Sequence, residues 1–237
     1  MTDETEAIKE SAKAVQEVAK TTGQAIDLCE KFGGFIAKFI DGPLKQGIGI
    51  FQDKLTYMRW ERQVRFIKRS EDLLNEVGIS SPTRPVPMKI AIPLIQAASL
   101  EEDDDLQDRW AKLLVNAGNA NSGVVVKRSY ISILEDLSPM DAKILEKICS
   151  VGLLDEVILT YKLPDEAVIS QTNNFYAEPS RDVELSLSNL MRLGCITSPL
   201  YMGGKLNLTE VQPTLLGCCL VKACTLQNKK KEQVVGD

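Results

Sequence analysis

The chain has 237 residues, with 28 basic and 33 acidic side chains and a formal net charge of −5 at pH 7. Hydrophobic residues make up 44% and charged residues 26%, the composition of an ordinary globular protein with a core. The negative charge and an aromatic content of 5% argue against a generally basic nucleic-acid coat and against broad base-stacking surfaces.

Histidine is absent from the sequence, and this limits the chemistry open to the chain. Imidazole acid–base catalysis, Ser-His and Cys-His nucleophile pairs and His-containing metal sites are excluded. None of the six cysteines forms a CxxC pair, so neither a zinc knuckle nor a thioredoxin-type motif is predicted. We expect most cysteines to be small buried hydrophobic residues in a reducing cytosol. We therefore predict no catalytic site, no cofactor and no metal.

Residues 1–79 are predicted to form an N-terminal amphipathic helical region. Helix formers run from Glu6 to Lys31, and an apolar stripe with i, i+3, i+4, i+7, i+8 spacing follows. Five glycines and several charges make the segment Phe32–Phe51 unsuitable as a transmembrane helix. We favour packing of the stripe on the next helix or a second subunit, with insertion of Phe32–Phe51 at a membrane surface as the alternative. The stripe consists of Phe32, Phe35, Ile36, Phe39 and Ile40.

A strong helix is predicted from Lys54 to Val77, with Gly78 at its C-terminal cap. Its basic stripe is either a solvated face, which we favour, or a docking surface for an acidic partner, a phosphate-bearing ligand or anionic lipid. The apolar face is expected to contain Tyr57, Trp60, Val64, Ile67 and Leu74, widened by Phe66, Leu73 and Val77. The candidate docking residues are Arg59, Arg62, Arg65, Lys68 and Arg69.

Three prolines in residues 80–87 predict an extended linker before a helical middle region over residues 88–137. Pro93 indicates a kink or a new helix start within that region. Carboxylates gathered at a helix start interact favourably with the helix dipole, so we expect a structural or partner contact there and not a divalent-metal site. These acidic candidates are Glu101, Glu102, Asp104, Asp105 and Asp108.

The last third, residues 138–226, is predicted to be a winged-helix-like module, followed by a basic tail at residues 227–237. A helix begins at Ser138-Pro139, a second spans about Asp182–Arg192, and a hairpin turns at Met202-Gly203-Gly204 before a final helix over Leu215–Leu226. The second helix carries a net charge of −1 in this interpretation, which disfavours DNA binding. No distinctive pattern occurs between Val151 and Arg181.

Four stretches taken together are similar to one known family: AKTTGQAIDLCEKFGGFIAKFIDGPL, YMRWERQVRFIKRSEDLLNEVGI, VPMKIAIPLIQAASLEEDDDLQDRWAKLLVNA and YISILEDLSPMDAKILEKI. Over about residues 15–225 the chain resembles the abortive-infection alpha family, most specifically in the proline segment, the acidic run and DRWAKLL. The resemblance implies a bacterial protein of phage defence, in which an infected cell shuts down before phage can spread. It supplies no catalytic residues.

The sequence therefore predicts a mainly α protein with N-terminal amphipathic helices, a helical middle and a winged-helix-like C-terminal module with a small β-hairpin. We expect a non-enzymatic defence protein that acts through a protein partner or as a homo-oligomer. The alternatives are a membrane-active effector and a winged-helix DNA-binding regulator. Nucleic acid and a small-molecule substrate are not expected. The polar segment MTDETEAIKES is not a secretory signal, so we expect a cytoplasmic chain, with peripheral contact at the inner membrane face left open.

Overall fold

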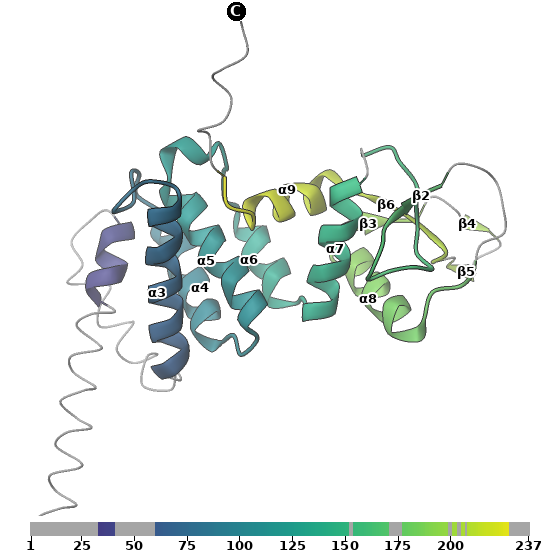
Figure 1. Ribbon diagram of the computed structural model, residues 1–237, viewed down its shortest axis with the longest axis horizontal. Coiled ribbons are helices and arrows are strands. Elements are labelled where there is room, and N and C mark those ends of the chain that lie inside the picture. The colour runs from purple at the N-terminus through teal and green to yellow at the C-terminus, as the bar shows by residue number, and fades with distance from the viewer. Residues whose placement is uncertain are drawn as a thin grey trace, which may run out of the picture.

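The computed structural model of the chain describes residues 33–40, 60–151, 154–170, 177–198, 201–202, 205–206 and 208–227. These residues form a mainly helical molecule with a small antiparallel sheet in the C-terminal part (Figure 1), which confirms the predicted fold class at this level. Residues Phe32, Phe51, Lys54 and Arg59 and the basic tail from residue 228 onward lie outside the described residues.

The helical body is built around α5, which packs against α3 and α4 and also reaches α7 and α9 (Figure 1). Trp110, Leu113 and Leu114 of α5 are almost completely buried, so this helix lies in the core along much of its length. The elements are a helix over residues 33–39, α3 (Trp60–Glu76), α4 (Met88–Leu100), α5 (Asp104–Gly118), the short 3-10 helix η2 (Ala120–Ser122) and α6 (Arg128–Glu135).

The helix ends follow local capping chemistry. Gly78 adopts a φ of 77° directly after α3, and the Ile79 N–H donates to the Leu74 carbonyl, as predicted for the C-terminal cap. Asp103 caps α5 by accepting the Leu106 N–H. α7 begins where the sequence predicted, because the Ser138 hydroxyl accepts the Asp141 N–H while the Asp141 carboxylate accepts the Ser138 N–H.

Two sequence-based expectations about helix interiors need correction. Pro93 lies inside α4, which excludes a new helix starting there. The expected apolar face of α3 is confirmed for Phe66, Leu73 and Leu74, which are buried, but not for Val64, which is 47% exposed. The side of α3 that faces the core also contains the polar residues Gln63 and Ser70.

The C-terminal part combines helices with short strands. Its elements are α7 (Pro139–Val151), β1 (Ile158–Leu159), β2 (Val168–Ile169), α8 (Arg181–Arg192), β3 (Ile196–Thr197), β4 (Tyr201–Met202), β5 (Lys205–Leu206), β6 (Glu210–Pro213) and α9 (Leu215–Ala223). Four strands form an antiparallel sheet in the order β2-β1-β6-β3, and β4 pairs with β5. The predicted hairpin is therefore present, while β1 and β2 come from the segment in which the sequence showed no pattern.

The first turn of α9 passes very close to the chain that leads into β3. A Cβ atom added at Gly217 would overlap the backbone carbonyl of Cys195. Thr214 stabilises this close contact between α9 and the chain before β3. Its hydroxyl donates to the Gly194 carbonyl oxygen at 2.6 Å and accepts the Gly217 N–H at 3.1 Å. The position therefore requires a residue without a side chain.

We predict that Gly217→Ala lowers the free energy of unfolding by about 1–3 kcal/mol, because backbone atoms have to move to admit the methyl group. Urea denaturation monitored by circular dichroism measures this change. Gly34→Ala is the matched control, since a Cβ at Gly34 meets nothing within 4 Å. An equal stability for Gly217→Ala and the unmodified chain would contradict the close approach.

Candidate functional site at the α3–α5 interface

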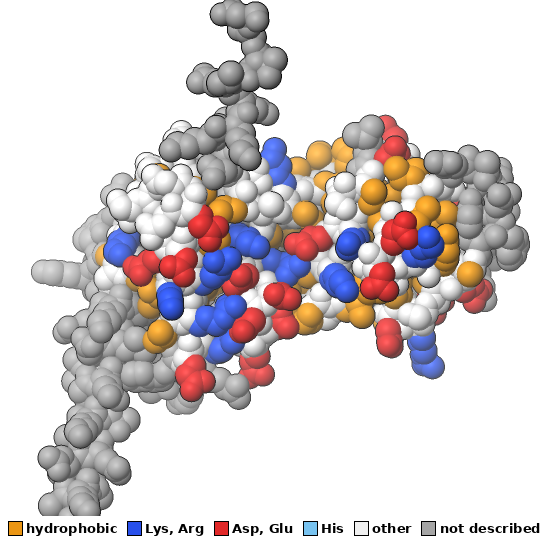
Figure 2. Space-filling view, in the orientation of Figure 1, with side chains coloured by type: hydrophobic (Ala, Val, Ile, Leu, Met, Phe, Trp, Pro, Cys, Tyr) orange, Lys and Arg blue, Asp and Glu red, His pale blue; other side chains and the backbone are white. Residues whose placement is uncertain are grey.

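The predicted basic and acidic clusters meet in the fold. Arg62, Arg65 and Arg69 follow each other at helical spacing along α3, opposite Asp104 and Asp108 in the first two turns of α5. Figure 2 shows the resulting mixture of basic and acidic side chains on the face over these two helices. We call these five residues the α3–α5 ladder. Its ion pairs are Arg62 Nη1–Asp104 Oδ1 at 2.6 Å, Arg65 Nε–Asp104 Oδ1 at 3.1 Å, Arg65 Nη2–Asp108 Oδ1 at 3.1 Å and Arg69 Nε–Asp108 Oδ2 at 2.9 Å.

Hydrogen bonds to the backbone reinforce the ladder at the junction of α4 and α5. The Arg62 Nε atom donates to the Glu101 carbonyl at 2.6 Å. Gln107 is buried between the three helices, and its amide nitrogen donates to the Arg62 carbonyl at 3.0 Å and to the Ala98 carbonyl at 2.9 Å. Its amide oxygen accepts from Arg65 at 2.9 Å. A buried amide that finds three partners fixes the helices in register, because a shift would leave polar atoms unpaired.

Contacts within the ladder favour the ionised forms of Asp104 and Arg69. The hydrogen bond from Arg62 lowers the pKa of Asp104, burial acts in the opposite direction, and the positive charges of Arg65 and Arg62 lower the pKa further. Burial disfavours the charge of Arg69, but the contacts with Asp108 and Glu76 outweigh it and raise the pKa of this guanidinium. The pKa values of Asp104 and Arg69 are thus each moved further from neutral pH. The arrangement is suited to holding the helices together.

The remaining members of the two predicted clusters have different positions. Lys68 is exposed on α3, and Glu102 and Asp105 are exposed at the start of α5. The Glu101 carboxylate accepts the Asp103 N–H at 2.9 Å. Within the described ranges, no three or more cysteine or acidic side chains are grouped so that they could hold a metal ion. The acidic run acts as helix cap, dipole partner and half of the ladder.

The predicted apolar stripe contributes to the core. Phe35, Ile36 and Phe39 are at most 3% exposed, and Ile40 is half-buried. The Phe35 ring lies 5.1 Å from the Phe39 centroid and 6.1 Å from the Phe66 centroid of α3, at an edge-to-face angle in the second case. These side chains would have to leave the core before they could meet a membrane. No described helix is long and apolar enough to span a bilayer.

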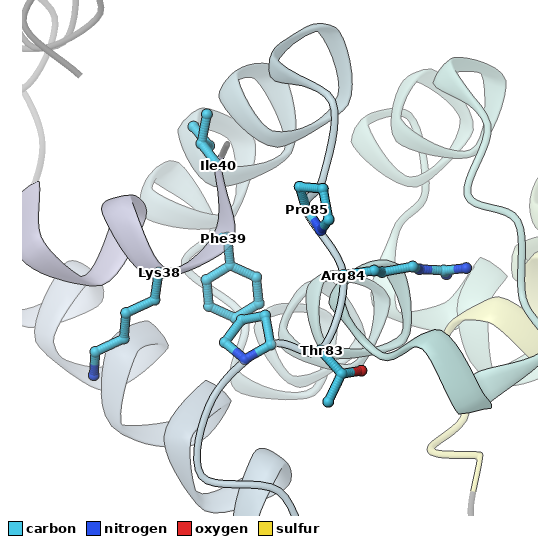
Figure 3. A pocket seen from close by; sticks show the side chains of 7 residues that line it. Lys38, Phe39, Ile40, Thr83, Arg84 and Pro85 are labelled. Atoms are coloured by element: carbon cyan, nitrogen blue, oxygen red, sulfur yellow. The ribbon is translucent and has the colours of Figure 1, made fainter. Parts of the chain in front are cut away.

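A shallow hollow of about 240 Å³ lies between the helix over residues 33–39 and the proline-rich segment (Figure 3). It is smaller than the roughly 300–1,000 Å³ of most ligand pockets. Two basic side chains line it, Lys38 and Arg84, and they point in opposite directions in Figure 3. Both form contacts outside the hollow. Lys38 pairs with Glu71 at 3.0 Å, and the Arg84 guanidinium donates to the carbonyls of Asn116, Ala117 and Val124. The hollow is therefore not a convincing ligand site.

The second helix of the predicted winged-helix-like module, on which the DNA-binding alternative depends, is α8, and it begins one residue earlier than predicted, at Arg181. Its two acidic and two basic residues give it a formal charge of zero, which corrects the predicted value of −1. Arg192 pairs with Asp136 at 3.1 Å and also contacts Asn189. The basic residue at the end of α8 is thus engaged within the protein, and the helix does not present the clustered cations that phosphate binding requires.

Sequence reasoning missed two buried amides that organise the structure, Gln107 and Asn116. The Asn116 amide nitrogen of α5 donates to the carbonyls of Ala223 at 2.8 Å and Thr225 at 2.7 Å, which fixes the end of α9 on α5. The sequence did contain a sign of both residues, because each is a polar residue within the apolar pattern of a helix that lies in the core. Such residues are retained when buried backbone groups need a partner.

Comparison with known proteins gives one match. A family model described as abortive infection alpha matches residues 61–216, more than half of the chain. The matched range contains the α3–α5 ladder and the whole sheet, while the helix over residues 33–39 and most of α9 lie outside it. No curated protein and no solved structure matches the chain.

We predict that Asp104→Asn lowers the urea midpoint at pH 7 and that this difference shrinks as the pH falls. The pKa of Asp104 is lower in the folded than in the unfolded state, so its ionised form stabilises the fold at pH values above the unfolded-state pKa. This stabilisation is lost as the pH falls through the folded-state pKa. The stability difference should therefore shrink in the acidic pH range below the ordinary pKa of an aspartate. Asp105→Asn, in the same turn and exposed, is the control. A difference that persists at the acid limit would contradict the ion-pair explanation.

We also expect energetic coupling between Arg65 and Asp108, whose side chains are 32% and 22% exposed. A double-mutant cycle with Arg65→Ala and Asp108→Ala should give a coupling energy of about 1 kcal/mol, decreasing with added salt. Lys68 provides the reference, because it is exposed on the same helix. The cycle of Lys68→Ala with Asp108→Ala should show a coupling near zero, and equal values in both cycles would refute the ladder.

Proposed function

The chain belongs to the abortive infection alpha family, and on this premise we propose that it performs its abortive-infection role by protein contact, without catalysis of its own. The contact is with a second copy of the chain or another protein. The side of α3 that faces away from the ladder provides it.

The titratable groups support a role without catalysis. Burial raises the pKa of the Cys195 thiol to about 11 and that of the Cys224 thiol to about 12, so both stay protonated at neutral pH. Asp104 is shifted in the opposite direction by Arg62. Catalytic nucleophiles, acids and bases work best with pKa values near the working pH. These thiols and this carboxyl are moved away from it.

The observation that carries the protein contact is the exposure of Val64 beside the core-facing side of α3. Phe66 and Leu73 are buried in the core, and Ile67 is half-buried and packs against it. Val64, one helical turn from Ile67, is 47% exposed and extends this apolar side to the protein surface. A protein partner that packs there buries Val64 and gains apolar contact.

The proposal is tested by placing a charge in the contact. In cells challenged with phage, Val64→Asp should weaken protection by about tenfold or more, because a charge desolvated in an apolar contact costs more than one factor of ten in binding. In light scattering after size exclusion, the unmodified chain should elute as an oligomer or with a bound protein, and Val64→Asp should not.

Val125→Asp is the matched control, because Val125 is 72% exposed in the loop before α6. It should retain both protection and assembly. An intact chain that leaves plaque numbers and burst size unchanged would reject the defence role of this chain. Full protection by Val64→Asp together with a monomeric intact chain would reject the contact and leave the defence role standing.

A further inference from the structure

Two cysteines far apart in the sequence meet across the interface of α7 and α9. The Cys149 and Cys218 sulfur atoms lie 3.0 Å apart, and both residues are half-buried. The two helices pack against each other, as Figure 1 also shows. The described cysteines only partly follow the sequence-based expectation, because Cys195 and Cys224 are buried whereas Cys149, Cys218 and Cys219 are not fully covered.

Both helices are held firmly enough to keep the two sulfur atoms together. α9 is fixed at its start by the Gly217 approach to Cys195 and at its end by the hydrogen bonds from Asn116. α7 is fixed at its start by Asp141, whose carboxylate also accepts from the Asn189 amide of α8 at 2.9 Å. Groups held in such proximity react with a high effective concentration.

We propose that Cys149 and Cys218 form an oxidative modification site, a dithiol that a hydroperoxide closes to a disulfide. A disulfide has a sulfur–sulfur distance of about 2.05 Å, so the atoms need to approach by about 1 Å. The proposal assigns this movement to rotation of the two half-buried side chains. The site is independent of the proposed protein contact, because it lies on α7 and α9 and not on α3.

The reaction balances with a hydroperoxide as the two-electron oxidant. The Cys218 sulfur attacks the terminal peroxide oxygen and becomes a sulfenic acid, while the oxygen–oxygen bond breaks and the other oxygen leaves with the thiol proton as an alcohol, or as water when the oxidant is hydrogen peroxide. The Cys149 sulfur then attacks the Cys218 sulfur, and its proton leaves with the displaced hydroxide as water. Burial and the neighbouring Cys218 raise the pKa of the Cys149 thiol. Cys149 is therefore protonated at neutral pH, and we assign the first attack to Cys218.

Closing the disulfide would link the two ends of the segment that contains the whole sheet and α8. The bond would remove open conformations of this segment from the unfolded state, an effect that grows with the length of the closed loop. The C-terminal part would thus become harder to unfold under oxidising conditions, and a reductant would reverse the change.

The test uses the purified full-length chain, reduced and then treated with hydrogen peroxide at low molar excess. Peptide mapping without reductant should find the Cys149 and Cys218 peptides joined, with a mass lower by two hydrogen atoms. The thermal midpoint should rise by about 5–10 °C, and dithiothreitol should restore both values. Consumption of thiols without this cross-link, or a cross-link between Cys195 and Cys218, would overturn the proposal.

Variants separate the pair from its neighbours. Cys149→Ser and Cys218→Ser should each abolish the cross-link and the rise in thermal midpoint. Cys219→Ser, at the adjacent half-buried position on α9, should retain both. The peptide map of the unmodified chain is decisive even if a serine variant folds poorly, because it does not depend on any substitution.

Discussion

Charge neutralisation between α3 and α5 is the interaction on which the N-terminal half of the structure depends. Three partly buried guanidinium groups lie against α5, where they would be unfavourable without the carboxylates of Asp104 and Asp108. Their pairing and the burial of Phe66, which meets Phe35 in the core, require the same rotation of α3 about its own axis, and this rotation leaves Val64 at the surface. The charged and the apolar contacts thus support one orientation of the helix.

The sequence predicted helix ends better than helix faces. Ends depend on local chemistry, such as the left-handed conformation of Gly78 and the exchange of hydrogen bonds between Ser138 and Asp141. The buried face of α3 depends on its neighbours. Periodicity placed Leu73 and Leu74 correctly, but it also included Val64, which is as apolar as they are and is 47% exposed. Two polar residues, Gln63 and Ser70, occupy the core-facing side because α4 and α5 approach there.

Most residues of the candidate site were identified from charge patterns, but their relation to one another was not. The basic stripe was interpreted first as a solvated face and the acidic run as a structural or partner contact, and the described arginines and aspartates are each other's partners. Pairing between distant segments leaves no trace in local periodicity. For the same reason, the sequence did not predict the contact between Cys149 and Cys218. It also did not predict β1 and β2, which are two residues long and are defined by the pairing of β1 with β2 and with β6.

The proline-rich segment has a consequence for how the chain tolerates change. Its composition suggests a place where residues could be inserted or the backbone cut without loss of structure. The Thr83 and Arg84 N–H groups, however, donate to the Gly118 carbonyl, and the Val86 N–H donates to the Phe39 carbonyl at 2.7 Å. Arg84 additionally occupies carbonyls at the end of α5. The segment therefore connects the helix over residues 33–39 with the end of α5, and lengthening or cleaving it would weaken this connection.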